Sequence, residues 1–170
     1  VNLISREAAK PWSVNVNARY GSHNNQRYGA SVGFRTKRWN SLTSFQYNSC
    51  GDVMFPDPKV EGEQNAYEKI YAFRTLNFKE RLSYEPIQRL KFTARAGYFF
   101  RERFSSETAN DRYRDFSGGL KANYRFIRNA DIELAYSFDQ YDKSDFLHAF
   151  RSDVRDYSNV QNSIRVLYNQ

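Results

Sequence analysis

The chain has 170 residues and a formal net charge of +7, and its mean hydropathy is −0.83 although 40% of its residues are hydrophobic. Aromatic residues make up 17% of the chain, with 13 Tyr and 14 Phe against a single Met, a mixture that is unusual for a soluble helical protein. No apolar run approaches the length of about 18 residues that a membrane-spanning helix needs. Lys and Arg are scattered among acidic residues, so we expect no nucleic-acid partner.

Eight segments alternate apolar and polar residues with a period of two, the pattern of β-strands that have one apolar and one polar face. In the first segment, Val14 and Val16 share one face, whereas Asn15 and Asn17 share the other. In chain order, the segments cover residues 13–20, 27–36, 39–47, 70–84, 90–100, 116–124, 131–138 and 160–168.

Short and long connections alternate between these segments. The short ones lie near residues 37, 87 and 128, and the longer, polar ones lie near 22 and over 49–69, 101–114 and 142–155. Outer-membrane barrels have short periplasmic turns and long external loops, which gives this alternation. The sequence therefore predicts an all-β fold, an antiparallel meander of about eight transmembrane β-strands that is part of an outer-membrane β-barrel.

Aromatic residues lie at the ends of the apolar faces, where they would form girdles at the two bilayer boundaries. They lie toward the long loops at Tyr20, Tyr28, Tyr98, Phe100 and Phe138, and toward the short turns at Trp39, Tyr84 and Tyr124. Such strands would also suit a soluble β-sandwich that buries its apolar faces in a dry core, so this alternative stays open.

Charged residues in the middle of the polar faces predict contacts inside a barrel. We expect Arg19, Arg35, Arg95 and Lys121 to face the lumen and to contact a plug or a solute. Gly29, Gly33, Gly97 and Gly119 fall on the same faces, and glycine within a strand is costly unless something approaches closely. A plug packed inside the barrel would be such a neighbour.

The external loops hold the remaining candidate site residues, which are His23, Asp52, Asp57 and His148. The histidines could contact haem or a metal chelate, but ordinary surface histidines are the preferred interpretation. Asp52 and Asp57, with Glu61 and Glu63, match no compact calcium loop. We therefore predict no metal site and no cofactor.

Enzyme signatures are also missing from the sequence, which has no phosphate-binding glycine loop, nucleophile elbow or paired-cysteine zinc pattern. The single cysteine, Cys50, has no histidine close in sequence and cannot form an internal disulfide. Asp139, Asp142, Asp145 and His148 form only a loose set of the kind found at the rims of barrel enzymes. We expect no enzyme.

Four segments resemble TonB-dependent outer-membrane receptors, especially those of Bacteroidetes. VNLISREA at the start resembles the last strand of their plug, and WSVNVNARYGSHNNQRYGASVGF resembles their first barrel hairpin. LSYEPIQRLKFTARAGYFFRER and IELAYSFDQYDKSDF resemble later hairpins. The likeness is one of general character and rests on no single specific motif.

The resemblance implies that residues 1–10 are the end of a plug and its linker, and that 11–170 are the N-terminal hairpins of a 22-stranded barrel. Its partners would be outer-membrane lipid, the plug and the TonB system, and a small-molecule nutrient. The parent protein would import a large scarce nutrient, such as a metal chelate, haem or cobalamin, across the outer membrane of a Gram-negative cell. The last aromatic residue, Tyr168, precedes the final residue by two positions, which favours a piece of a larger barrel. The open alternatives are a complete eight-stranded barrel with a structural or adhesive role, and a soluble β-sandwich binding module.

Overall fold

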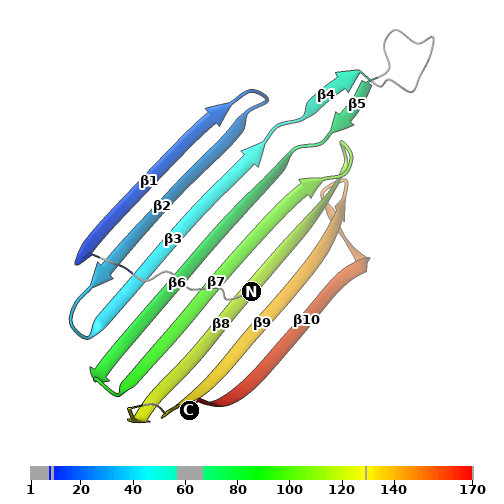
Figure 1. The fold of residues 1–170 in the computed structure, drawn as a ribbon. Helices are drawn as coiled ribbons and strands as arrows, with labels where there is room; N and C mark the ends of the chain where they lie inside the picture. Colours follow the sequence, from blue (N-terminus) through cyan, green and yellow to red (C-terminus); the bar gives the residue numbers. More distant parts are fainter. Residues whose placement is uncertain (1–7, 9, 57–66, 129, 170) are drawn as a thin grey trace.

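One antiparallel sheet of eight strands makes up most of the fold (Figure 1). The computed structural model describes residues 8, 10–56, 67–128 and 130–169. The strand order in the sheet is β1-β2-β3-β6-β7-β8-β9-β10, a meander, and a separate hairpin pairs β4 with β5. The strands are β1 (Trp12–Gly21), β2 (Asn25–Arg35), β3 (Trp39–Cys50), β4 (Val53–Pro56), β5 (Tyr67–Ile70), β6 (Phe73–Ile87), β7 (Leu90–Phe104), β8 (Ala109–Ile127), β9 (Ala130–Leu147) and β10 (Phe150–Asn169). The predicted all-β antiparallel meander is confirmed.

The register of the ladders joins the predicted apolar positions into one continuous face. Directly opposed residues of an antiparallel pair point to the same side of the sheet. Val14 opposes Val32, Phe45 opposes Phe78, and Leu120 opposes Tyr136. We call this side the apolar face, and we call the opposite side, which carries the intervening residues, the polar face.

Burial is inverted relative to a water-soluble sheet. On the apolar face, Val16 is 74% exposed and Ile164 is 75% exposed, whereas on the polar face Ser83 is 2% and Thr93 is 3% exposed. Among the described residues, Ala8 and Ala130 are the only buried hydrophobic ones. The part of the chain that the structure describes therefore has no dry sandwich core between two sheets. It also contains no helix that is long and apolar enough to cross a membrane.

The predicted longer connection near residue 22 is wrong, since only residues 22–24 separate β1 from β2. Two of the predicted long loops are wrong as well. Residues 101–114 and 142–155 continue the strands instead: β7 runs to Phe104, β8 begins at Ala109, and β9 and β10 are separated only by His148 and Ala149. His148 and Ala149 have φ of 50° and 66°, the left-handed conformation of a tight hairpin turn. Cross-strand ion pairs and ring contacts extend these ladders, although neither face is apolar there.

The predicted long loop over 49–69 is also partly wrong, because it contains the β4–β5 hairpin and because β6 begins at Phe73 rather than near Ile70. Asp52 closes the base of this hairpin. Its carboxylate accepts a hydrogen bond from the Ala72 amide at 2.7 Å and pairs with Lys69 at 3.0 Å.

The segment before β1 reaches the sheet on its polar face. Ala8 exchanges two hydrogen bonds with the Asn40 side chain, through the Ala8 amide at 3.2 Å and the Ala8 carbonyl at 3.0 Å. Arg35 Nη1 also donates to the Ala8 carbonyl, at 3.4 Å. A Cβ atom on Gly33 would clash with Ser13 Oγ of β1 and would lie 3.1 Å from the Ala8 Cβ, so the neighbouring strand and the N-terminal segment both approach this glycine closely. Residues 1–7 and 9, which carry most of the predicted plug end, lie outside the described residues.

Candidate functional site

Aromatic pairs border the apolar face at both ends. Toward the short turns, ring centroids lie 4.7 Å apart for Trp12 and Phe34 and 4.2 Å apart for Trp39 and Tyr84. Toward the opposite end, the pairs are Tyr28 with Tyr47 and Tyr98 with Phe116, at 6.3 and 4.8 Å. From Trp39 to Tyr47 a strand rises about 26 Å at about 3.3 Å per residue. At a strand tilt of about 40°, this length corresponds to about 20 Å along the membrane normal, which is of the order of the apolar band of about 25 Å that outer-membrane barrels present to lipid.

Glu80 interrupts the apolar face between these two borders. Ser41 Oγ donates to its carboxylate at 2.9 Å, and Thr43 Oγ1 donates to the other carboxylate oxygen. Both hydroxyls belong to β3, the neighbour of β6 in the sheet. The carboxylate is thus held within the apolar face and does not point to the polar one.

A groove of about 820 Å³ lies on the polar face over β3 and β6 to β10. Two glycines keep its floor low: a Cβ atom on Gly97 would lie 2.5 Å from Ser117 Oγ, and one on Gly119 would lie 3.2 Å from the Tyr136 carbonyl oxygen. The polar side chains that line the groove include Ser44, Lys79, Arg81, Arg95, Ser117, Lys121, Ser137, Ser163 and Arg165.

Charges on β8, β9 and β10 neutralise one another across the strands. Glu133 on β9 accepts from Lys121 Nζ on β8 at 2.8 Å and from Arg165 Nη2 on β10 at 2.9 Å. Nearer the short turns, Asp131 accepts from the side-chain amides of Asn123 and Asn169 at 2.8 and 3.2 Å. These ladders tie three strands together on the polar face.

The polar face of the other strands is basic. The register and the sequence place no carboxylate on this face of β1, β2, β3 or β7, and on β6 they place only Glu85, beside a short turn. Glu85 pairs with Lys91 at 3.0 Å. The cations on this face between the aromatic borders, or within one residue of them, are Arg19, Arg27, Arg35, Lys79, Arg81, Lys91 and Arg95.

All four cations predicted to face the lumen lie on the polar face, but they do not form one site. Arg95 and Lys121 line the groove, whereas Arg35 bonds to Ala8 and Arg19 directly opposes Arg27 toward the other end of β1. Sequence reasoning placed Arg165 on the polar face but did not single out the groove residues Lys79 and Arg81. The alternation of polar and apolar residues in β6 would have placed them on the polar face, as it did for Arg95 in β7.

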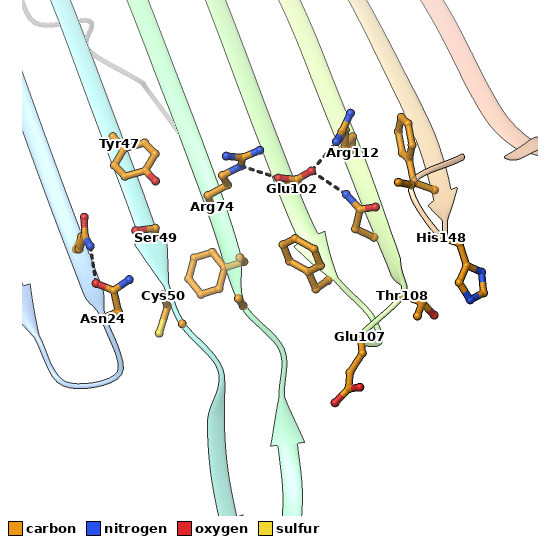
Figure 2. Close-up of a pocket in the computed structure, with 18 residues that line it drawn as sticks. Asn24, Tyr47, Ser49, Cys50, Arg74, Glu102, Glu107, Thr108, Arg112 and His148 are labelled. Carbon is orange, nitrogen blue, oxygen red and sulfur yellow. Dashed lines mark hydrogen bonds and ion pairs between the residues drawn. The ribbon is translucent and has the colours of Figure 1, made fainter. Parts of the chain in front are cut away.

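A second hollow, of about 750 Å³, lies at the end of the sheet away from the short turns, beyond Tyr98 and Phe116 (Figure 2). Glu102 is 2% exposed there and is held by three donors, namely Arg74 Nε at 2.5 Å, Arg112 Nε at 2.7 Å and Asn110 Nδ2 at 2.7 Å. Burial raises the pKa of Glu102, but Arg112 and Arg74 together outweigh burial and hold its pKa below the ordinary value. The carboxylate is therefore charged at neutral pH.

The predicted loop residues do not converge. His23 lies in the β1–β2 turn and His148 in the β9–β10 turn, at the same end of the sheet but at opposite edges. The carbonyl of His23 accepts from the Gly51 amide at 2.7 Å, and the His148 amide donates to Thr108 at 2.7 Å. Cys50 lines the hollow together with His148 but comes from the other side of it (Figure 2).

The candidate metal and rim residues are also separated. Lys69 pairs with Asp52 and lowers its pKa, whereas Asp57, Glu61 and Glu63 lie outside the described residues. Asp142 accepts from Ser158, on the face opposite to Asp139 and Asp145. Within the described ranges, no three His, Cys, Asp or Glu side chains are grouped closely enough to hold a metal ion.

The chain was also compared with known proteins. No model of a known protein family matches it, and no curated protein matches it.

Proposed function

We propose that this chain forms part of the wall of a β-barrel in the outer membrane of a Gram-negative bacterium, within an uptake receptor of the TonB-dependent type. The observation that carries the proposal is the inverted burial of the sheet. Its apolar face is exposed between the aromatic borders, whereas Asn40, Ser83, Thr93 and Glu133 are buried on its polar face.

The size of the exposed apolar face supports lipid as its neighbour. Fully burying one Val, Leu or Ile side chain contributes about 1.5–3 kcal/mol, so leaving many of them in water is costly. Val14, Val16, Leu120, Ile164 and Val166 are all more than half exposed. Contiguous apolar surface on this scale marks a membrane or protein contact, and aromatic borders at both ends suit a bilayer with two boundaries.

The stagger of the strands supports closure into a barrel. Near the start of β3, Asn40 pairs with Ser83, but β6 runs four residues further, to Ile87, before it turns. In the same way, Leu90 at the start of β7 pairs with Tyr124, but β8 runs three residues further, to Ile127. Each short turn therefore lies further along the strand direction than the one before, as the stepped edge in Figure 1 shows. Barrel closure requires this kind of stagger, because the strands tilt relative to the barrel axis.

The position of Ala8 supports a domain inside the barrel. The chain reaches β1 across the polar face, which would be the lumen wall, and its backbone bonds to Asn40 and Arg35 there. A plug that precedes β1 would enter the lumen along this path. A complete eight-stranded barrel has less support, because β1 and β10 form no ladder with each other in the described residues.

Uptake by the native bacterium tests the function. Cells that lack the gene are compared with complemented cells for uptake of radiolabelled haemin, ferric desferrioxamine and cobalamin, with and without a protonophore. We expect uptake of one class to fall at least tenfold on deletion, and the protonophore to abolish the difference.

Cell fractionation in the same strains separates the two parts of the proposal. Recovery of the protein from the soluble fraction would contradict the membrane wall. Recovery from the outer membrane, with uptake of all three nutrients unchanged, would contradict the uptake role and leave the wall standing.

A further inference from the structure

We infer that two arginines on the outward side of the sheet, Arg74 and Arg112, bind phosphate groups of the lipid in the outer leaflet. The site is the hollow beyond Tyr98 and Phe116 (Figure 2), and it is separate from the groove on the polar face. It goes beyond the proposed uptake role, but it rests on the proposed membrane wall, which makes the apolar side of the sheet the outward one.

The two arginines and Glu102 lie on the side of the sheet that carries the apolar face. Glu102 is four residues beyond Tyr98 on β7, so the period of two keeps both side chains on one side. Arg74 on β6 and Arg112 on β8 directly oppose Glu102 across the strands. The hollow that these three residues line therefore opens toward the lipid and not toward the lumen.

The arginines on this side of the sheet gather at one end. Among the strand residues of the main sheet whose side chains the structure describes, the Lys and Arg residues on this side are Arg74, Arg112, Arg114 and Arg151. All four lie beyond the aromatic border at the end away from the short turns, which is the external end if the short turns are periplasmic. Cations at only one of two bilayer boundaries favour an anionic partner at that boundary.

The height of the arginines above the aromatic border matches the lipid headgroups. Arg112 lies four residues beyond Phe116, and Arg74 lies two residues beyond Leu76, which opposes Tyr47 of the border. At about 3.3 Å per residue and a tilt of about 40°, these steps rise about 5–10 Å along the membrane normal. The headgroup layer of a bilayer is about 5–8 Å thick, so the guanidiniums lie at its level.

Glu102 holds the two guanidiniums in place. It is 2% exposed and accepts from Arg74 Nε at 2.5 Å, from Arg112 Nε at 2.7 Å and from Asn110 Nδ2 at 2.7 Å. The Arg112 guanidinium also lies over the ring of Phe146, with Cζ 4.1 Å from the ring centroid. The side chains of Arg74 and Arg112 are nevertheless 53% and 34% exposed, so a ligand in the hollow can reach both.

The chemistry of this arrangement suits a phosphate group. Both arginines bond to Glu102 through Nε, and the Nη groups of a guanidinium can donate two parallel hydrogen bonds to a phosphate. Two guanidiniums and one carboxylate leave a net charge of +1, which one phosphate group would compensate. Glu107, the other carboxylate that lines the hollow, pairs with Lys69 at 3.6 Å.

Equilibrium binding of radiolabelled diphosphoryl lipid A to the intact protein in a non-ionic detergent tests the inference. Lipid A from which both phosphates have been removed is the comparison ligand. The triple variant Arg74→Gln/Glu102→Gln/Arg112→Gln removes the site without leaving a buried carboxylate unpaired. Arg74→Gln alone is a milder second variant, because Glu102 keeps Arg112 and Asn110.

Arg103→Gln is the matched control. Arg103 follows Glu102 on β7, is 55% exposed, points to the polar face and pairs with Asp111. It removes one positive charge, as Arg74→Gln does, and the net charge of the triple variant also falls by one. Far-UV circular dichroism verifies that each variant keeps its strand content.

We expect diphosphoryl lipid A to bind at least tenfold more tightly than the phosphate-free lipid. The triple variant should abolish this preference, Arg74→Gln should weaken it at least threefold, and Arg103→Gln should leave it unchanged. Equal binding of the two lipids, or an unchanged preference in both site variants, would overturn the inference. So would equally tight binding of inorganic phosphate, which would identify a site for a soluble anion. Cell fractionation and nutrient uptake do not depend on these results, so the lipid site can fail while the proposed function stands.

Discussion

Placing a charge in the middle of the apolar face separates a lipid-facing sheet from a water-facing one. Leu120 is the best position, because it lies on β8 midway between Phe116 and Tyr124, four residues from each. At about 3.3 Å per residue, each of these aromatics is about 13 Å away along the strand. Leu120 is 61% exposed and opposes Ala94 and Tyr136.

The expected cost of Leu120→Arg depends on what covers the face. At the middle of a bilayer, an arginine on the lipid side of a barrel costs about 2–4 kcal/mol. At about 1.4 kcal/mol per factor of ten, this lowers the folding equilibrium constant by about 30- to 700-fold. In water the same change would cost at most about 1 kcal/mol, because Leu120 is mostly exposed and the arginine stem would cover its neighbours.

The assay is urea unfolding of the intact protein in lipid vesicles, followed by tryptophan fluorescence. Asn15→Arg is the control, because Asn15 is an exposed polar-face residue of β1 that opposes Ser31. We expect this control to change the free energy of unfolding by less than about 0.5 kcal/mol. A Leu120→Arg cost equal to that of the control would refute the lipid-facing assignment.

Three further predictions follow from the charged networks. Glu102→Gln should destabilise the protein by about 1–2 kcal/mol at pH 7, since it weakens two charge-assisted hydrogen bonds. The pKa of Glu102 is depressed in the folded protein, so the stability that its charge contributes is present above the ordinary carboxyl pKa and is lost as the pH falls through the folded pKa. The urea midpoint should therefore fall less between pH 7 and pH 3 in the variant than in the natural protein. Asp52→Asn should speed hydrogen exchange of the Ala72 amide, which would then lose a charged acceptor; unchanged exchange there would contradict the pairing. Glu133→Gln should lower the free energy of unfolding by about 1 kcal/mol, since Lys121 and Arg165 would each lose a charged acceptor, and an unchanged urea midpoint would contradict their pairing.

The sheet and its two faces could be predicted because most of the strands alternate between apolar and polar residues over the length of a bilayer. Val14 to Tyr20 and Leu90 to Ala96 differ in polarity at every step, so the period of two is visible without the structure. Beyond the aromatic borders this contrast disappears. Glu102 and Arg103 lie on opposite faces and both are charged, so the residues there show no alternation and the sequence predicted a loop.

The groove could be predicted only in part. The phase of the alternation placed Arg95 and Lys121 on the polar face, as the structure shows. Which cations meet depends on register, and register depends on turn lengths and on the irregularity between Tyr84 and Ile87. The direct opposition of Arg81 and Arg95 follows from that register and not from any local motif.

Contact between the apolar face and hydrocarbon is the central claim, and lipid quenching tests it most directly. In a Cys50→Ser background, single cysteines replace Leu120 or Ile164 on the apolar face and Ser117 or Ser163 on the polar face, and each carries a fluorophore in vesicles of brominated lipid. The account predicts strong quenching at both apolar-face positions and little at the polar-face positions. Equal quenching on both faces, or an apolar face reached only by a water-soluble quencher, would contradict it.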